Sequence, residues 1–524
     1  MTLQRIRRVH AADPALVYTI VALLFMAVYS HHFGNTIATN SGLGWDGRIY
    51  GDYAQTFLHR LTTQGFESWY YAARMLPSGL VWALLPIIGK PRSLSNVITG
   101  FEILNVVLLV SSSVIWSATG RALALSRRAI AIGHVAGMVS FAVLKMTFFY
   151  PVLTDTAAYA CGYLLVYAYV TNRLGLLLVG WLAGGFVFPP LVLMGLLLVA
   201  LPRSAGQSAP PGRSMPNRTL TAALLGGYTL VGFAVARSDW SFNNWPASTP
   251  AERVLLVTGS ALAMGYVALA MTPLLRAAHL PSPGRLLRMI PLRRLSVALV
   301  GGVLMITAYG YLAANGGTES PQSFGGYVAR WFANSNSNLW GTPLPLVFVA
   351  AHLAYFGPAL ALLVVWWRRV VRALARLGIG AIALAIVAVL QSLNSESRQL
   401  IAFYPLFVLL LAMSSEDSRQ AGMRRWQLLV LGSVALVASR IWLWIPPDLG
   451  EPFSDPGMQR YFMNHGPWMA RGSYPMQMGL AAVMLLGTWL VAKAPSLPPS
   501  ARNWAPERSH PLGSTDKADV GHSA

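Results

Sequence analysis

The chain has 524 residues, of which 55% are hydrophobic and 11% are charged, and its mean hydropathy is +0.51. A soluble globular protein contains about 25% charged residues, so this composition excludes that class. The formal net charge is +21, but the arginines cluster in short loops between apolar runs. This placement indicates a role in membrane topology and contact with anionic lipid, and we expect no nucleic-acid partner. The single cysteine, Cys161, excludes a disulfide within the chain.

The first element is an apolar run over residues 15–29, preceded by Arg5, Arg7 and Arg8. This arrangement is typical of a signal peptide, but the following Tyr-Ser-His-His-Phe offers no small-residue cleavage site. We therefore expect an uncleaved first helix with its N-terminus in the cytoplasm. The polar loop over residues 31–75 is then expected to lie on the non-cytoplasmic face.

Apolar runs long enough to span a membrane recur along the rest of the chain. A shorter run over residues 76–88 predicts a partly inserted or interfacial helix. The run over residues 174–201 is too long for one span, and its central Gly-Gly and Pro-Pro pairs predict a hairpin of two helices. Other spans are expected near residues 97–118, 129–147, 152–170, 220–236, 253–275, 295–313, 344–367, 377–392, 400–413, 427–445 and 475–493.

The distribution of arginine supports the hairpin. With two helices over residues 174–201 the basic loops fall on the cytoplasmic side, whereas with one helix the bias would reverse after residue 201. These basic residues are Arg121, Arg127, Arg128, Arg203, Arg213, Arg218, Arg276, Arg285, Arg288, Arg293, Arg294, Arg368, Arg369, Arg372, Arg376, Arg419, Arg424 and Arg425.

The predicted fold class is an all-α polytopic membrane protein. It has about 12–14 hydrophobic helices, including one Pro-broken hairpin, with amphipathic interfacial helices in the first external loop. We expect a single transmembrane domain over residues 1–493, with its functional external loop at 31–75. A disordered cytoplasmic tail is expected over residues 494–524 because this segment is rich in Pro, Ser and charge.

Two aspartates stand out in the first external loop. Asp46 lies in a Gly-rich segment and could form a simple Asp-Gly turn. Alternatively, its flanking rings, Trp45 and Tyr50, could stack on a sugar or sit at the bilayer interface. Asp52 and Gln55 predict a helix N-cap with a capping-box partner, and the apolar stripe after them predicts a helix lying along the membrane.

Further charged residues are expected near the same membrane edge. Arg74, at the end of the loop, could contact lipid headgroups or hold a phosphate through its guanidinium fork. Asp155 opens a later helix, where the helix dipole or a pair with Lys145 could stabilise it. Glu396 and Arg398 lie in a very short external link, where polar residues are expected in any case. Alternatively, an arginine fixed there could bind a phosphate group.

The remaining polar residues are assigned more simply. His134 and His352 lie within or near spans, where we expect hydrogen bonds between helices in preference to a proton relay. We find no phosphate-binding Gly-rich motif and no His/Cys cluster with metal-ligand spacing, and expect neither a metal nor a cofactor. Several external residues are aromatic or amide side chains suited to recognising an acceptor: Trp240, Asn243, Asn244, Trp245, Trp331, Asn334, Asn336, Asn338 and Trp340.

Taken together, these motifs resemble the GT-C superfamily of integral-membrane glycosyltransferases, in particular bacterial members that build cell-surface glycans. The resemblance rests on the broken hairpin, Trp45-Asp46-Gly47 with Tyr50, Arg74-Met-Leu-Pro77, Thr154-Asp155, and Glu396-Ser-Arg398 before a run with Pro405. It implies an inverting hexosyl- or pentosyltransferase of the bacterial inner membrane. The donor is expected to be a polyprenyl-phosphate-linked sugar, and the acceptor a glycan or glycolipid on the non-cytoplasmic face.

The resemblance also implies roles for single residues. An acid in the first external loop acts as the general base in this family, and Asp46 matches that position best. Arg74 or Arg398 would bind the donor phosphate. The residues expected to contact substrate are Trp45, Tyr50, Asp155 and Glu396.

The chain departs from the family pattern because its first loop has no tight Asp-x-Asp or Glu-x-Asp pair.

Two other functions remain as hypotheses. A transporter or flippase for a lipid-linked glycan would need polar residues along a path through the bilayer. A surface-polysaccharide polymerase or ligase would also use arginines on the external face, with a long-chain lipid-linked donor.

Overall fold

The computed structural model describes residues 13–201, 249–277, 290–314, 344–416, 425–445 and 473–493, together with residues 203, 226–227 and 423. Within these ranges every regular element is helical, which confirms the all-α fold class. Five helices are long and apolar enough to cross a membrane, a bent helix pair gives a sixth candidate, and seven shorter apolar helices accompany them. The chain is therefore a multi-pass membrane protein.

Some expected features lie outside the described residues. They include most of the span near residues 220–236, the external Trp- and Asn-rich segments, the basic N-terminal region and the tail over residues 494–524.

The long apolar helices occur where the hydropathy of the sequence predicts them. In the first of these helices, Asp13 accepts a hydrogen bond from the amide of Leu16 at 3.1 Å and the first residue is a proline, a favourable start for a helix. The five are α2 (Pro14–Phe33), α6 (Leu94–Ala122), α13 (Pro250–Ala277), α15 (Leu292–Ala314) and α24 (Tyr474–Lys493).

The hairpin expected over residues 174–201 is confirmed as two helices, α10 (Leu174–Gly185) and α11 (Pro190–Ala200). They pack against each other, and the indole nitrogen of Trp181 in α10 donates to the carbonyl of Val192 in α11 at 2.9 Å. The break follows from its sequence, because a proline in a helix interior removes a backbone donor and clashes with the preceding turn.

Two expected spans are broken where we predicted continuous helices. One bends by 59° between α7 (Arg127–Met138) and the helical segment Phe141–Phe149, which ends in α8 (Met146–Phe149). The other divides into α17 (Val347–Phe356) and α18 (Pro358–Val365) at Gly357. The φ angle of Gly357 is +70°, a left-handed conformation that glycine adopts readily, and the proline after it starts the second helix.

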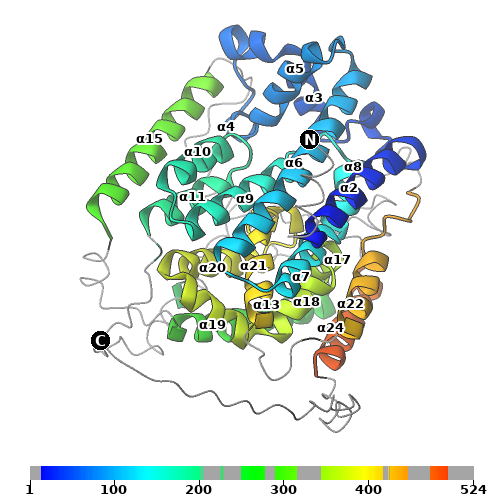
Figure 1. Ribbon diagram of the computed structural model, residues 1–524, viewed down its shortest axis with the longest axis vertical. Helices are drawn as coiled ribbons and strands as arrows, with labels where there is room; N and C mark the ends of the chain where they lie inside the picture. The colour runs from blue at the N-terminus through cyan, green and yellow to red at the C-terminus, as the bar shows by residue number, and fades with distance from the viewer. Residues whose placement is uncertain are drawn as a thin grey trace, which may run out of the picture. The chain divides into compact units, whose positions relative to one another are not determined.

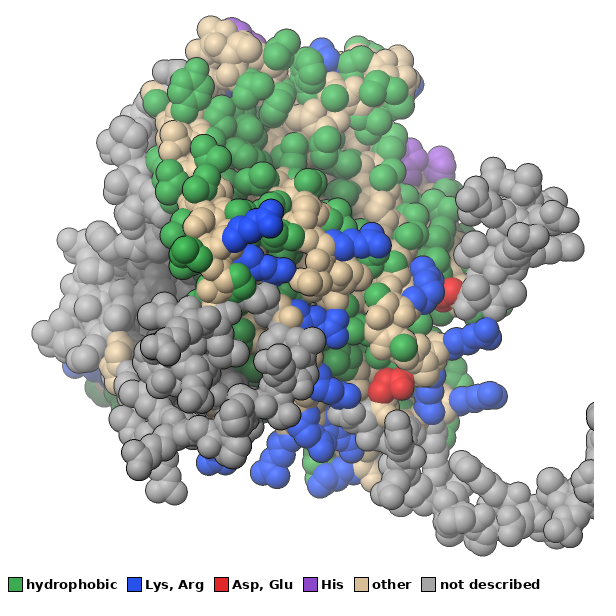
Figure 2. Space-filling view, turned by 60° about the vertical axis from the view of Figure 1, so that its left-hand side comes forward, with side chains coloured by type: hydrophobic (Ala, Val, Ile, Leu, Met, Phe, Trp, Pro, Cys, Tyr) green, Lys and Arg blue, Asp and Glu red, His purple; other side chains and the backbone are tan. Residues whose placement is uncertain are grey.

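A helix that we did not predict, α19 (Trp367–Leu377), occupies a segment expected to be a basic loop. It is amphipathic: Val370 and Leu374 are fully buried, while most of its arginines are exposed. The next helices are α20 (Ile379–Gln391), α21 (Tyr404–Glu416) and α22 (Arg425–Ala438). Figure 2 shows Lys and Arg side chains gathered toward the lower part of one face, below a broad apolar surface.

The first loop folds into short helices, as expected, but its main helix begins earlier than predicted. This helix, α3 (Gly47–His59), has Asp46 at its N-cap position, and the amide of its first residue donates to the Tyr150 hydroxyl at 3.1 Å. Asp52 therefore lies inside the helix, where it pairs with Arg60 at 2.8 Å, and the N-cap predicted at Asp52 is wrong. The loop continues with the short α4 and then α5, whose bounds are Trp69–Ala72 and Leu76–Ile87.

The helix ends gather on two sides. Contacts on one side join Ile37 to Phe149, Phe66 to Leu312, Leu76 to Phe186 and Asp46 to Arg398. Contacts on the other side join Ser126 to Glu416, Val170 to Arg203, Asn172 to Arg294 and Tyr169 to Leu377. The hairpin tip thus shares a side with the first loop, as the arginine distribution predicts. Figure 1 shows α3 and α5 toward one end and α19 toward the other.

Candidate functional site

Asp46 and Arg398 form the centre of the candidate site. The Arg398 guanidinium Nη2 lies 3.1 Å from Asp46 Oδ2, although the two residues are 352 positions apart in the chain. The Tyr70 hydroxyl donates to the same oxygen at 3.3 Å. The other Asp46 oxygen takes part in neither contact, and the side chain is 28% exposed. The fold therefore brings together a predicted base and a predicted phosphate ligand, and the carboxylate remains accessible.

The short link after α20 orients Arg398. The Glu396 carboxylate accepts a hydrogen bond from Arg398 Nε, and its other oxygen accepts one from the Gln399 side chain at 3.0 Å. The Glu396 amide is in turn held by the Asn394 side chain at 2.9 Å. Burial lowers the pKa of Arg398, but the carboxylates of Glu396 and Asp46 outweigh that effect and raise its pKa well above the usual value. Arg398 is therefore a permanently charged group held in one orientation.

His352 fixes the same link from α17. Its Nε2 lies 2.7 Å from the Ser392 carbonyl and its Nδ1 lies 2.9 Å from the Ser397 hydroxyl. A carbonyl can only accept, so we assign the proton to Nε2, and the Ser397 hydroxyl then donates to Nδ1. His134 makes a comparable bond from α7 to Ser117 in α6 at 2.9 Å. Both histidines make the structural hydrogen bonds expected from the sequence.

Arg74 lies behind this centre, stacked between two rings. Its guanidinium carbon is 4.1 Å from the Tyr70 ring centroid and 4.6 Å from that of Phe188, which belongs to the hairpin tip. Its Nη1 donates to the Tyr50 hydroxyl at 3.5 Å. Arg74 is only 1% exposed and Tyr50 is fully buried. The structure thus places both residues beneath the accessible surface, where Arg74 contributes positive charge and Tyr50 supports it.

The two tyrosines near Arg74 stay protonated. Burial raises the pKa of the Tyr70 and Tyr50 hydroxyls well above the usual value, and Arg74 opposes this only in part. Tyr70 can therefore only donate to the Asp46 carboxylate.

Asp155, the first residue of α9 (Asp155–Val170), is a buried acid near the centre. Its strongest charge interactions are with Arg398 and Arg74, and its carboxylate faces the Tyr355 hydroxyl. Neither oxygen reaches hydrogen-bond geometry with a residue in the described ranges. Lys145, which we considered as a partner, donates its hydrogen bonds elsewhere. Asp155 is thus held near the arginines by its position at the helix start.

Other residues around the centre differ in how far the sequence indicated them. Trp45 is half-buried and meets the Tyr150 ring edge-on at 6.5 Å, so it borders the site beside Asp46. Tyr70 was not predicted, although its spacing of four residues before Arg74 suits stacking within a helical turn. Phe188 and Tyr355 were also missed, and nothing in their sequence context distinguishes them from core aromatics.

The arrangement has a definite chemical capacity. A partly exposed carboxylate can accept a proton, and guanidinium groups bind phosphate oxygens through two parallel hydrogen bonds. Among the residues that the structure describes, no three His, Cys, Asp or Glu side chains gather closely enough to hold a metal ion. No family model, curated protein or solved structure matches the chain. The function is therefore inferred from the geometry of the site and from its sequence motifs.

Proposed function

We propose that the chain is a membrane glycosyltransferase that uses a polyprenyl-phosphate-linked sugar as donor. The observation that carries this proposal is the 3.1 Å pair between Asp46 and Arg398. It joins an acid of the first loop to an arginine of a distant link, and Arg74 and Asp155 add further charge around it. A base beside a fixed cation, at the edge of a membrane bundle, suits the displacement of a lipid phosphate from a sugar.

In the proposed reaction, an acceptor hydroxyl attacks the anomeric carbon of the donor sugar. The new carbon–oxygen bond forms as the bond from that carbon to the phosphate oxygen breaks, with inversion at the carbon. Asp46 accepts the hydroxyl proton, which leaves late in the step, so a carboxylate can serve as the base. The leaving group is the polyprenyl phosphate, and the fixed charge of Arg398 stabilises it as it departs.

The two arginines have different parts in this proposal. Arg398 is the better candidate for direct contact with the phosphate, because its side chain is 13% exposed and its Nη1 takes part in neither carboxylate contact. Arg74 is buried and supplies positive potential from behind Tyr70. Trp45 and Glu396 border the same region and are proposed to contact the sugar or the acceptor.

The proposed setting is the inner membrane of a bacterium, with the N-terminus in the cytoplasm and Asp46 on the opposite side. The acceptor would be a glycan or glycolipid of the cell envelope. This orientation follows from the arginine bias of the sequence, and the separation of the two sets of helix ends is consistent with it.

The decisive variant is Asp46→Asn, compared with Asp52→Asn from the same helical segment. Asparagine keeps the shape of the side chain but cannot accept the proton, so we expect transfer to fall by about 10²- to 10⁴-fold. Asp52 pairs with Arg60 away from the centre, so its variant should retain activity. The measurement is sugar transfer in proteoliposomes supplied with a panel of undecaprenyl-phosphate hexoses and pentoses, alongside envelope glycan analysis of complemented deletion cells.

Normal transfer by a folded Asp46→Asn protein would remove Asp46 from its proposed role. The same proteoliposomes test the transporter hypothesis with a fluorescent lipid-linked glycan. Movement of that lipid across the bilayer without any transfer of sugar would contradict the enzyme proposal as a whole.

A further inference from the structure

A second feature of the molecule is an apolar groove away from the candidate site. It has a volume of about 610 Å³ and lies between α22, α24 and the end of α17. Its walls are mainly aliphatic side chains, several of them exposed, including Val437 at 62% and Val483 at 70%. Exposed aliphatic surface on membrane-spanning helices contacts lipid chains, so this groove opens toward the membrane.

One end of the groove is polar. Arg440 follows the last turn of α22 and donates through Nη2 to the Gln477 side-chain oxygen at 3.3 Å. Gln477 is only 1% exposed, and its Nε2 has no hydrogen-bond acceptor among the residues that the structure describes. A buried amide group without an acceptor is costly, and an anionic oxygen at this end would satisfy it. The described groove lining contains no acidic residue.

Positive charge is concentrated at that end. Leu443, three residues after Arg440, accepts a hydrogen bond from Lys145 Nζ at its carbonyl at 2.7 Å. Lys145 forms no ion pair with a carboxylate in the described ranges. Trp442, which belongs to the groove lining, is 62% exposed, and Trp444, two residues later, is 64% exposed. Tryptophans of this kind are typical of the headgroup level of a bilayer.

The backbone of Arg440 is also unusual, because its φ angle is +52°. A residue just past the end of a helix often adopts this left-handed conformation, but it is usually glycine or asparagine. The chain thus keeps an arginine at a position where the backbone favours glycine, and such positions are frequent at functional sites.

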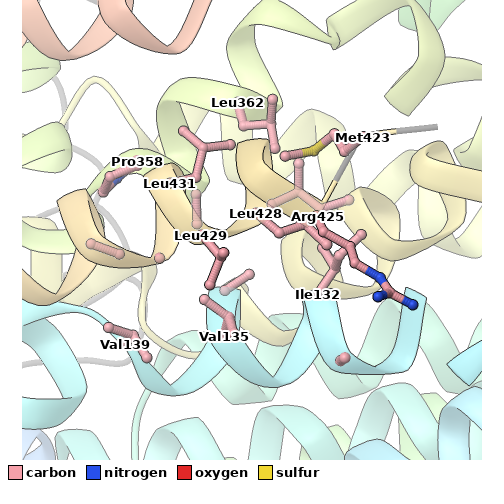
Figure 3. Close-up of a pocket in the computed structure, with 16 residues that line it drawn as sticks. Ile132, Val135, Val139, Pro358, Leu362, Met423, Arg425, Leu428, Leu429 and Leu431 are labelled. Atoms are coloured by element: carbon pink, nitrogen blue, oxygen red, sulfur yellow. The ribbon is translucent and has the colours of Figure 1, made fainter. Parts of the chain in front are cut away.

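A second apolar groove lacks, in the part of the chain that the structure describes, a polar end like the one formed by Arg440 and Gln477. It lies between α7 and α22, has a volume of about 430 Å³, and includes Arg425 at the opposite end of α22. Figure 3 shows the aliphatic stem of Arg425 beside the apolar lining while its guanidinium points away from it. Among the described residues of that lining, Arg425 is the only one with a polar side chain, and no buried amide accompanies it there.

From these contacts we propose that the groove at Arg440 and Gln477 binds a membrane phospholipid with a net negative headgroup. The headgroup phosphate would accept hydrogen bonds from Arg440 and Gln477, and an acyl chain would lie along the aliphatic wall. This site is separate from the proposed donor site because two aromatic residues lie between them. The Phe141 ring centroid is 5.7 Å from the Arg440 guanidinium, and Phe141 packs against Tyr355, whose hydroxyl faces Asp155.

The test measures lipid retention by the full-length protein. Purified protein is exchanged into mixed micelles that contain phosphatidylglycerol and phosphatidylcholine, and native mass spectrometry gives the affinity for each lipid. We expect preferential binding of one phosphatidylglycerol. Arg440→Gly and Gln477→Leu should each weaken it by about tenfold, as loss of a charge-assisted hydrogen bond predicts. Arg425→Gln removes one positive charge from the other end of α22 and should leave the affinity unchanged.

Two design features keep the test decisive. Arg440→Gly relaxes the left-handed backbone, so we expect this variant to fold, and Gln477→Leu conserves volume and leaves every charge in place. Equal retention of the two lipids, or equal loss in the Arg425→Gln control, would overturn the proposal. Displacement of phosphatidylglycerol by substoichiometric undecaprenyl phosphate, dependent on Arg440, would also overturn it by identifying an isoprenoid phosphate as the occupant.

Discussion

At the scale of single residues, Tyr70 connects the two charged parts of the candidate site. Its hydroxyl donates to Asp46 at 3.3 Å, while its ring covers the Arg74 guanidinium at 4.1 Å. These two contacts can be separated by substitution. Tyr70→Phe removes the hydroxyl and keeps the ring, whereas Tyr70→Ala removes both.

We expect Tyr70→Phe to lower sugar transfer by less than about tenfold, because the 3.3 Å hydrogen bond is long and Arg398 still holds the Asp46 carboxylate. Tyr70→Ala should lower it by more than about tenfold, since Arg74 also loses one of its two cation–π partners and part of its shield from water. Initial rates of transfer in proteoliposomes measure both. Equal losses in the two variants would show that only the hydroxyl matters.

The sequence allowed part of this centre to be predicted. Asp46, Arg398 and Glu396 are polar residues at expected loop positions in a chain with few charges, and the structure brings them into contact. The burial of Arg74 and Tyr50 could not be predicted, because a loop sequence does not reveal which of its side chains the neighbouring hairpin will cover. Phe188 provides that cover from the hairpin tip.

At the scale of elements, the α10–α11 hairpin depends on close helix contact. A Cβ atom added at Gly195 in α11 would lie 1.9 Å from Trp181 Cδ1 in α10, far inside van der Waals contact. The Trp181 indole is also hydrogen-bonded to α11, so it cannot move away without losing that bond. Gly195 is therefore required by packing.

We expect Gly195→Ala to destabilise the protein by about 1–3 kcal/mol, as overpacking of a dense core does. Gly175→Ala is a matched control in α10, because no atom lies within 4 Å of its added Cβ and alanine favours the helix. Thermal unfolding can be followed with a thiol-reactive dye at Cys161, the only cysteine, which lies near the hairpin glycine Gly184. Similar unfolding temperatures for both variants would contradict the packing argument.

The sequence predicted elements best where hydropathy and helix breakers agree. The Gly-Gly and Pro-Pro pairs within residues 174–201 located the hairpin correctly. The break at Gly357 was missed because a lone Gly-Pro step inside an apolar run is compatible with a kinked helix. α19 was missed because its arginines suggested a loop, although its apolar residues recur at helical spacing.

At the scale of the whole molecule, the two sets of helix ends explain how distant segments form one site. Contacts that join the first loop to the hairpin tip and to the Glu396–Arg398 link lie together. On the opposite set, Arg203 contacts Val170 and Arg294 contacts Asn172, both at the end of α9. The alternation of apolar runs could be predicted from sequence. The pairing of residues 46 and 398 could not, because it depends on how the helices pack.

The sidedness of this arrangement gives the last prediction. In a Cys161→Ala background, single cysteines replace the exposed residues Thr63, Arg173 and Arg376. The positive-inside bias places Thr63 outside the cytoplasm and the two arginines within it. A membrane-impermeant maleimide should therefore label the Thr63→Cys protein in spheroplasts, and label the other two only after lysis.

Each pattern of labelling has a distinct meaning. Inverted labelling would put Asp46 in the cytoplasm and exclude an envelope acceptor for the proposed transferase. Labelling of Thr63→Cys and Arg173→Cys from the same side would contradict the odd number of crossings predicted between them. Opposite labelling of Arg173→Cys and Arg376→Cys would contradict the even number predicted between those two positions, and with it the hairpin. The expected pattern requires both the hairpin and the orientation, because changing either one moves at least one of the three cysteines across the membrane.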